Sequence, residues 1–247
     1  MNRTWKLILV SSLIGNLLIV YVAYKALDYR RHVNFFLDKY TSVVAEFSGR
    51  SRYEAENRRL ASAESAHGRL VFFGSQVTEG WSPARYFPEW ETLNRGIAGQ
   101  RLAGYLLRFR PDVIELAPRA VVIEFSSYNF RPEFTRLELQ DYVVTMAELA
   151  RLHGIEPILT TAIPVRQRLV YESYSVSDSL AIYNRWLRDF CRERGYALAD
   201  FDSVLSDSGG FLPEEFSTSH IELNDAGYER ISAALREVLT DLETKYH

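Results

Sequence analysis

A serine, a histidine and two carboxylic acids stand at positions where they could carry out nucleophilic chemistry. Ser75 follows a glycine after a short apolar run, and His220 lies close to Glu222 and Asp225 further along the chain. A hydroxyl, an imidazole and a carboxylate are the groups that serine-dependent acyl transfer needs. The histidine and the acids do not predict a metal site, because three ligands on one loop fall short of a site signature. The single cysteine, Cys191, is predicted to be a buried thiol on an amphipathic helix.

The composition restricts the class of protein. The 247 residues are 47% hydrophobic and 25% charged, with a formal net charge of -3. These values are typical of a globular protein that buries a substantial core. The small negative charge does not favour binding to nucleic acid, and one cysteine excludes an intramolecular disulfide. No phosphate-binding or dinucleotide-binding motif is present, so we expect neither a nucleic-acid partner nor a cofactor.

The N-terminal region is unusually apolar. Residues 7–24 form a stretch of eighteen residues without a charge, which is at the lower edge of what one transmembrane helix requires. We predict a single-span membrane anchor over residues 1–27. A cleaved signal peptide and a buried helix of a soluble domain are the alternatives, although no small-residue cleavage site follows the stretch. Basic residues flank it on both sides, so the positive-inside rule selects no orientation.

A second helical pattern follows the apolar stretch. From Val33 to Phe47 apolar residues recur every three to four positions, as they do on one face of an amphipathic helix. Gly49 is predicted to end this helix, and residues 50–66 are polar and helix-prone. We therefore expect a helical stalk over residues 28–66. Its apolar face either packs on the chain's own domain or supports self-association, for which the repeat is short.

From about residue 68 onward, short apolar runs alternate with amphipathic stretches. Strands and helices that alternate in this way predict right-handed crossovers and a parallel sheet covered on both faces. The fold class is therefore α/β, a three-layer α/β/α domain over residues 67–247. The predicted strands are residues 69–73, 92–95, 120–125, 155–161 and 197–200. The predicted helices are residues 100–110 (ending before Pro111), 136–153, 177–194 and 225–240.

Ligands bind such sheets outside the carboxyl ends of the strands, and the segments at those ends resemble the SGNH (GDSL-type) hydrolase family. Residues 73–81 (FGSQVTEGW) are similar to the family's first block, GDSITxGW, and residues 94–100 (NRGIAGQ) to its second. Residues 121–130 (VVIEFSSYNF) resemble the third block, a strand that ends in GTND. Residues 216–228 (FSTSHIELNDAGY) resemble the last block, DGxHPNxAGY. Four matches in the family's order imply its flavodoxin-like α/β/α fold.

The resemblance also implies serine-dependent ester hydrolysis, in which a histidine takes the proton of the serine and an aspartate orients the histidine. Carried over position by position, Ser75 stands at the aspartate of the GDS motif and Gln76 at the nucleophilic serine. Gly99 keeps the glycine that helps to bind the oxyanion, whereas Tyr128 replaces the oxyanion asparagine. An amide side chain is not a nucleophile, so the first block lacks its reactive group.

The last block departs from the family in the same way. Ser219 takes the place of the aspartate and Glu222 the place of the histidine, while His220 stands at an intervening glycine. Loss of the nucleophile or base of a hydrolytic triad costs on the order of 10⁶ in turnover. We therefore expect a family member that has kept the fold and lost the triad. Its candidate binding residues are Gln76, Gly99, Tyr128, Ser219 and Glu222.

Three hypotheses about function remain open. In the first, a membrane-anchored, catalytically degenerate protein binds a glycan, an acylated ligand or an envelope protein partner, and Gln76 and Tyr128 either bind that ligand or fill the old cavity. In the second, an active esterase or O-acyltransferase uses a rearranged pair, Ser75 and His220. In the third, the anchor and stalk serve as an assembly element. The family's usual exported habitat implies a cell-membrane location with the domain on the outer face.

Overall fold

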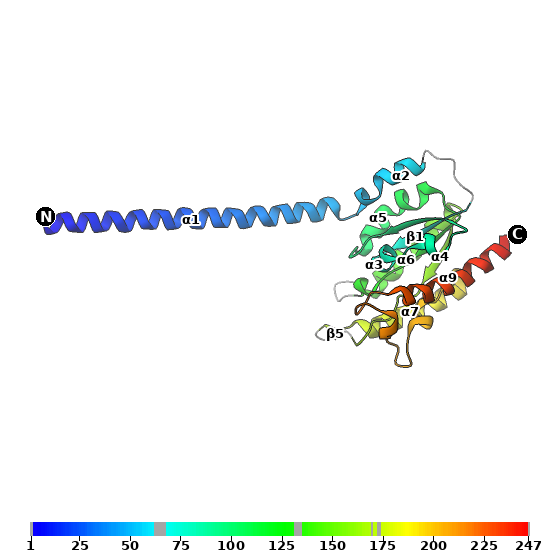
Figure 1. Cartoon of the computed structure of the whole chain (residues 1–247). Helices are drawn as coiled ribbons and strands as arrows, with labels where there is room; N and C mark the ends of the chain where they lie inside the picture. The colour runs from blue at the N-terminus through cyan, green and yellow to red at the C-terminus, as the bar shows by residue number, and fades with distance from the viewer. Residues whose placement is uncertain (1, 62–67, 131–134, 169, 172–173, 247) are drawn as a thin grey trace. The chain divides into compact units, whose positions relative to one another are not determined.

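The computed structural model describes residues 2–61, 68–130, 135–168, 170–171 and 174–246. It does not describe the side chains of residues 42–46, 61, 128, 171, 174, 245 and 246. The chain divides into two compact units, Met1–Phe47 and Ser48–His247 (Figure 1). The first unit holds one helix, and the second holds the sheet with its covering helices.

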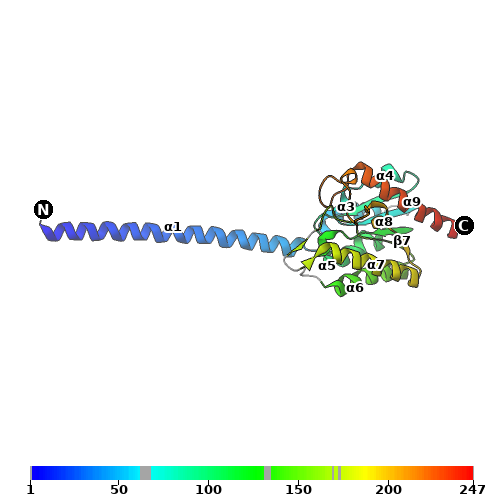
Figure 2. The same ribbon diagram turned by 90° about the horizontal axis from the view of Figure 1, so that it is seen from below.

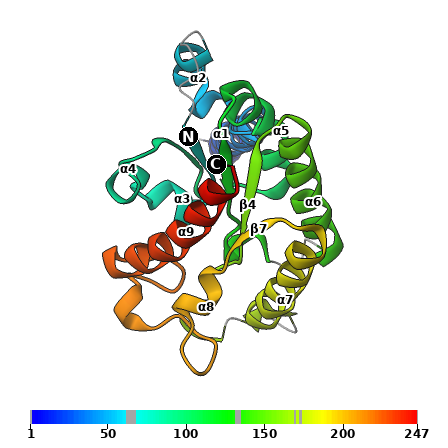
Figure 3. The ribbon, with the colours of Figure 1, turned by 90° about the vertical axis from the view of Figure 1, so that its right-hand side faces the viewer.

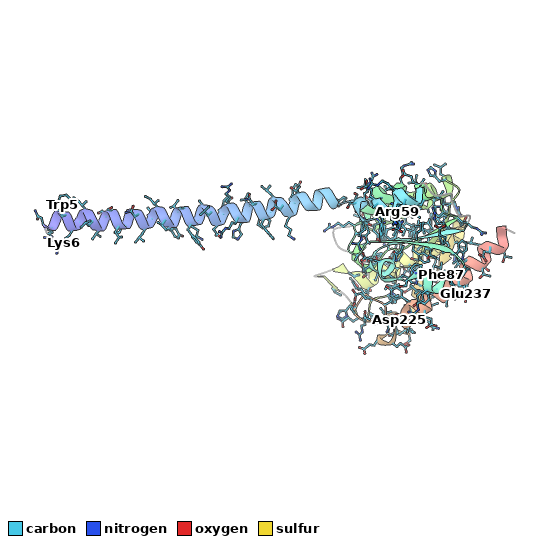
Figure 4. The ribbon with its side chains drawn as sticks, turned by 45° about the horizontal axis from the view of Figure 1, so that its top comes forward. Trp5, Lys6, Arg59, Phe87, Asp225 and Glu237 are labelled. Carbon is cyan, nitrogen blue, oxygen red and sulfur yellow. The ribbon has the colours of Figure 1, made fainter. Side chains whose placement is uncertain are left out.

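The first unit is α1 (Arg3–Glu46), a single continuous helix. Trp5 and Lys6 stand near its N-terminal end (Figure 4). Its segment Arg3–Thr41 is long and apolar enough to cross a membrane, with a hydropathy of 2.2 in the most apolar window. No part of that window is buried, unlike the core helix of a globular domain. The 44 residues of α1 rise roughly 66 Å at 1.5 Å each, whereas the hydrocarbon core of a bilayer is about 30 Å thick. The helix therefore can cross a bilayer and extend well beyond it.

The second unit contains five parallel strands and a short hairpin. The strands of the main sheet are β1 (Arg69–Gly74), β2 (Glu91–Gly96), β3 (Ala120–Ile123), β4 (Glu156–Thr160) and β7 (Ala197–Ala199). The hairpin is made of β5 (Val170–Tyr171) and β6 (Tyr174–Ser175). The α-helices are α2 (Glu54–Ala61), α3 (Gln76–Gly80), α4 (Pro83–Tyr86), α5 (Leu102–Asp112), α6 (Arg136–Leu152), α7 (Val176–Arg194), α8 (Phe201–Leu205) and α9 (Asp225–Tyr246). Short 3₁₀ turns occupy Arg50–Arg52, Ile114–Leu116, Ser127–Asn129 and Glu214–Phe216.

The strand order is β2-β1-β3-β4-β7, and all neighbouring pairs are parallel. Phe72 of β1 pairs with Asn94 of β2 on one side and Val122 of β3 on the other. With these five strands numbered in chain order, the arrangement is the 2-1-3-4-5 order of doubly wound, flavodoxin-like folds. The predicted fold class is confirmed. In this order the chain reverses direction across the sheet between β1 and β3, so the ligand crevice is expected beyond their carboxyl ends.

Helices cover both faces of the sheet (Figures 2 and 3). Because successive strand residues point to opposite faces, Val71 and Phe73 pack with α5, α6 and α7, whereas Leu70 and Phe72 pack with α3, α4, α8 and α9. Cys191 of α7 lies in the first of these cores as a buried free thiol, as predicted. Burial raises its pKa to about 12, so it is a poor nucleophile.

The compact unit begins at Ser48, well before the boundary at residue 67 that the sequence pattern predicts. The polar helix α2 belongs to it, because Asn57 is buried and Leu60 packs against the core. The segment is otherwise polar, so the sequence pattern does not reveal that Asn57 and Leu60 contact the domain. The predicted stalk, residues 28–66, is therefore divided between α1 and the domain.

Helix α5 runs to Asp112 and contains Pro111, which the sequence analysis expects to follow the end of the helix. Proline has no backbone N–H, so Pro111 makes no i→i−4 hydrogen bond, and α5 ends one residue later. The buried side chain of Asp112 is also held in place by Arg108 and Asn57. Helix α9 extends to Tyr246, beyond the predicted end at residue 240, and the short helices α3, α4 and α8 have no counterpart in the prediction.

Candidate functional site

The candidate site lies beyond β1, β2 and β3, where glycines allow the following segments to pack closely. A Cβ atom on Gly74 would lie 2.1 Å from Thr78 Oγ1 and 2.5 Å from Glu124 Oε2. A Cβ atom on Gly96 would lie 2.1 Å from the backbone nitrogen of Glu79. Helix α3 therefore sits directly on the ends of β1 and β2, and side chains at these two positions would displace it.

Ser75 and Glu124 form the buried centre of the site. The Ser75 hydroxyl donates to the Glu124 carboxylate, with 3.0 Å to each oxygen. The backbone nitrogen of Ser75 donates to Oε2 at 2.8 Å, and Thr78 Oγ1 donates to the same oxygen at 2.9 Å. Both Ser75 and Glu124 are 1% exposed. Desolvation raises the pKa of Glu124, and these hydrogen bonds oppose the rise.

The sequence analysis missed Glu124. The signal was present, because Glu124 is a charged residue at the end of an otherwise apolar strand, AVVIEF. Buried carboxylates need hydrogen-bond donors, and such groups gather at functional sites. Here the carboxylate binds the backbone and side chain of Ser75, the residue that stands at the family's aspartate. An acid directly after β3 thus lies beside the position that lacks its own acid.

The structure does not bring Ser75 and His220 together. The Ser75 hydroxyl is buried against Glu124, whereas the His220 side chain is exposed. The described contact of His220 is made by its backbone oxygen, which accepts from Arg166 N at 3.0 Å. Within the described ranges no hydrogen bond joins the serine and histidine side chains. A working nucleophile and base need such a bond.

Gln76 and Gly99 lie at the more accessible edge of the site. Gln76, the first residue of α3, is half-buried, and its Oε1 accepts from Ser126 Oγ at 3.2 Å. The Gln76 Nε2 donor is buried and has no partner among the described residues. Gly99 is exposed, has a φ of +70°, and leaves open space where a Cβ would stand. Its backbone can therefore be approached closely, as the oxyanion glycine of the family must be.

Two further buried residues, Tyr105 and Asn129, adjoin this centre. The Tyr105 hydroxyl lies near the side chains of Ser75 and Asn129, but it has no well-formed hydrogen bond among the described residues. Both amide atoms of Asn129 are likewise unpartnered within the described part of the chain. Burial raises the pKa of Tyr105 well above its usual range. The side chain of Tyr128, a predicted binding residue, lies outside the described residues, and its neighbour Asn129 was not predicted.

The last motif keeps its structural residues in the expected places. Asn224 Nδ2 donates to the oxygen of Glu215 at 2.8 Å, and Asn224 Oδ1 accepts from Gly227 N at 3.0 Å. Tyr228 OH donates to the oxygen of Val77 at 3.0 Å, which ties α9 to α3. Asp225 begins α9 (Figure 4). These bonds hold the segment in the register that the resemblance assigns.

The positions that carry acid–base chemistry in that motif are at least partly exposed here. Ser219 is half-buried, and its hydroxyl accepts from Ile221 N at 3.4 Å. Glu222 is exposed, and its backbone oxygen accepts from Thr218 N at 3.0 Å. Within the described ranges, no group of three or more His, Cys, Asp or Glu side chains is placed to hold a metal ion. The site therefore consists of amides, hydroxyls and one buried acid.

Comparison with known proteins identifies the family. Residues 47–230 match the GDSL-like lipase/acylhydrolase family, which accounts for most of the chain. The chain belongs to this family. Among curated proteins, the uncharacterised lipoprotein YqeF of Bacillus subtilis is 33% identical over 81 residues. That match covers 30% of this chain and spans 33% of the length of YqeF.

Solved structures agree with this assignment. A candidate acylhydrolase from Bacteroides fragilis is 26% identical, with a TM-score of 0.72 over 79% of this chain and 97% of that protein. A GDSL-like lipase from Bacteroides thetaiotaomicron is 24% identical, with a TM-score of 0.72 over 80% of this chain and all of that protein. An acetylxylan esterase from Geobacillus stearothermophilus is 15% identical, with a TM-score of 0.56 over 71% of this chain and 95% of that protein. The lipase and the acetylxylan esterase, at 24% and 15% identity, show similarity of fold alone.

Proposed function

We propose that this protein is a membrane-anchored member of the GDSL family that binds a ligand at the former active site without hydrolysing it. The hydroxyl of Ser75 carries the proposal. It is 1% exposed, and it is held against a buried carboxylate instead of a histidine. The residue at the nucleophile position, Gln76, has an amide side chain.

The proton-transfer groups support the same proposal. A hydrolytic serine requires a base that takes its proton and a second acid that orients the base. Glu222 and Ser219 occupy the corresponding positions, and both face solvent at least in part. Loss of a triad nucleophile or base lowers turnover on the order of 10⁶-fold. Since both are replaced, hydrolysis by the family mechanism is not expected.

The proposed ligand is an acylated glycan. Gln76 Nε2 is a buried donor without a partner among the described residues, and Gly99 presents open backbone. An ester carbonyl and sugar hydroxyls would provide the acceptors and donors that such groups bind. The acetylxylan esterase that shares this fold acts on an acylated glycan by its name. A protein partner of the cell envelope is the competing hypothesis, and the absence of saturable glycan binding would favour it.

The proposed location is the cell membrane, with α1 as a retained anchor and the domain on the outer face. The apolar window of α1 and its exposed side chains support the anchor. The lipoprotein YqeF, which matches part of the chain, supports membrane association. A cleaved signal peptide is the competing possibility, and the mass of the mature protein distinguishes the two.

The test uses the full chain in detergent micelles and acetylated xylo-oligosaccharides as the probe. Equilibrium binding and acetate release are measured on the same samples. We expect saturable binding, which Gln76→Ala weakens, and acetate release no faster than in buffer. Asp189→Asn, at a half-exposed position on α7 that pairs with Arg192 and lies outside the candidate binding residues, is the control and should bind with little change. Acetate release that Ser75→Ala abolishes would establish the alternative, an active esterase.

A further inference from the structure

The segment that joins α1 to the domain contacts the loops of the candidate site. We call residues 48–57 the junction segment, residues 74–76 the first site loop and residues 96–100 the second site loop. Gln100 Nε2 donates to the backbone oxygen of Ser48 at 2.9 Å. Tyr53 OH donates to the backbone oxygen of Gly96 at 2.5 Å. The junction segment therefore holds the second site loop at both of its ends.

Gly49 allows the junction segment to approach the second site loop closely. It has a φ of +64°, and a Cβ at this position would lie 2.8 Å from Ile97 Cδ1 and 3.0 Å from Gln100 Nε2. Distances this short require the neighbouring atoms to move. A methyl group at residue 49 would thus meet the side-chain tips of Ile97 and Gln100, two residues after the first unit ends. The amide of Gln100 donates to Ser48 O and accepts from Arg108 Nε, so its displacement would disturb both hydrogen bonds.

Arg108 of α5 links the second site loop to the first site loop through hydrogen bonds. Its side chain is fully buried, with Nε donating to Gln100 Oε1 and one terminal nitrogen donating to Gly74 O at 3.2 Å. The other terminal nitrogen donates to Arg95 O at 2.7 Å and to Asp112 Oδ2 at 2.9 Å. One guanidinium group therefore joins the ends of β1 and β2.

A second set of contacts joins the far end of the junction segment to the same cluster. Asn57 Nδ2 donates to Asp112 Oδ1 at 2.6 Å, and Asn57 Oδ1 accepts from Arg95 Nε at 3.1 Å. The Arg95 guanidinium also lies over the Tyr53 ring, 4.7 Å from its centre. Buried polar networks of this kind are costly when only partly satisfied. A change at one end is therefore expected to disturb the rest.

We propose that the junction segment and the candidate site are coupled, so that the conformation of residues 48–57 controls the order of the two site loops. By thermodynamic reciprocity, a ligand that orders these loops also orders the junction next to α1. The ligand half of this statement rests on the proposed function, whereas the coupling of the loops does not.

The test compares Gly49→Ala with Gly195→Ala in the full chain in detergent micelles, read by amide hydrogen exchange. Both glycines have a φ of +64°, but a Cβ at Gly195 meets nothing within 4 Å. An alanine in this backbone region costs about 1–2 kcal/mol, which corresponds to roughly 5- to 30-fold faster exchange where the strain is released by local opening. We expect that increase at the amides of Ser75 and Ile97, which bond to Glu124 and Gly74, in Gly49→Ala only.

Tyr53→Phe provides a milder variant in case Gly49→Ala does not fold. It removes one hydrogen bond and keeps the ring beneath Arg95. One such bond is worth about 0.5–1.5 kcal/mol, so exchange at the same two amides should rise roughly 2- to 12-fold. An increase confined to residues 48–57, or equal patterns in the two glycine variants, would overturn the proposal. Because exchange needs no ligand, this result is independent of the binding and turnover measurements.

Discussion

Replacing Asp112 by asparagine removes the only formal counter-charge that the described residues bring into hydrogen-bond contact with Arg108. Both side chains are fully buried. The remaining Arg108 acceptors are the neutral oxygens of Gln100, Arg95 and Gly74. Desolvation lowers the pKa of the Arg108 guanidinium, and the charge of Asp112 opposes that shift. Asp112→Asn keeps the size of the side chain and leaves a buried cation without its partner.

The expected loss of stability is large. Removing one partner of a buried ion pair costs about 3–5 kcal/mol. For a unit of this size, each kcal/mol lowers Tm by about 2–4 °C, so we expect a fall of roughly 6–20 °C. The assay is thermal and urea unfolding of the full chain in detergent micelles, followed by circular dichroism.

Asp189→Asn is the matched control. Asp189 pairs with Arg192 one helical turn away on α7, and both side chains are about half exposed or more. Exposed pairs of this kind are worth about 0–1 kcal/mol, so Tm should change by no more than a few degrees. If Asp112→Asn and Asp189→Asn had equally small effects, the Arg108–Asp112 pair would not support the ends of β1 and β2, and the reasoning from burial would be refuted.

Three further outcomes are expected. Burial raises the pKa of Glu124, so the folded protein holds this proton more tightly than the unfolded chain. The stability that the bound proton contributes is lost as pH rises from the ordinary pKa of a glutamate through the raised one. Unfolding measured across that range should show Glu124→Gln losing less stability than the wild type, and parallel curves would contradict the burial argument. Gln76→Ser alone should give no ester turnover above background, because the positions of Ser219 and Glu222 still lack the orienting acid and the base; substantial turnover would show that the assignment of the last motif is wrong. The full chain should remain in the membrane pellet after alkaline carbonate extraction and keep the mass of an uncleaved N-terminus, whereas a soluble, shortened protein would identify a signal peptide.

The sheet could be predicted because each strand corresponds to a short run of mostly apolar residues in the sequence. Runs such as AVVIEF are buried on both faces of the sheet, and no helical period competes with them. In the last of the four motifs, Asn224, Gly227 and Tyr228 make hydrogen bonds that hold the segment in place. Those residues are recognisable in sequence because their roles depend on backbone contacts.

The polar interior could not be predicted in the same way. Glu124 directly follows β3, Arg108 and Asp112 belong to α5, and each has a partner far away in sequence. A charged residue in an amphipathic helix is ordinarily solvent-exposed, and Arg108 differs only because the loops of the site fold over it. Residues 50–61, predicted as part of the stalk, pack on the chain's own domain, since Asn57 finds its partners on β2 and α5.

The most direct test of the central claim is whether Ser75 can react as a nucleophile. The full chain in detergent micelles is treated with a fluorophosphonate, which labels activated serines, and the intact mass and peptide masses are then measured. A hydroxyl that is 1% exposed and bonded to Glu124 should give no adduct on Ser75, with a native GDSL esterase labelled in parallel as the positive control. A single stoichiometric adduct on Ser75, absent from Ser75→Ala, would contradict the account and establish an active serine hydrolase.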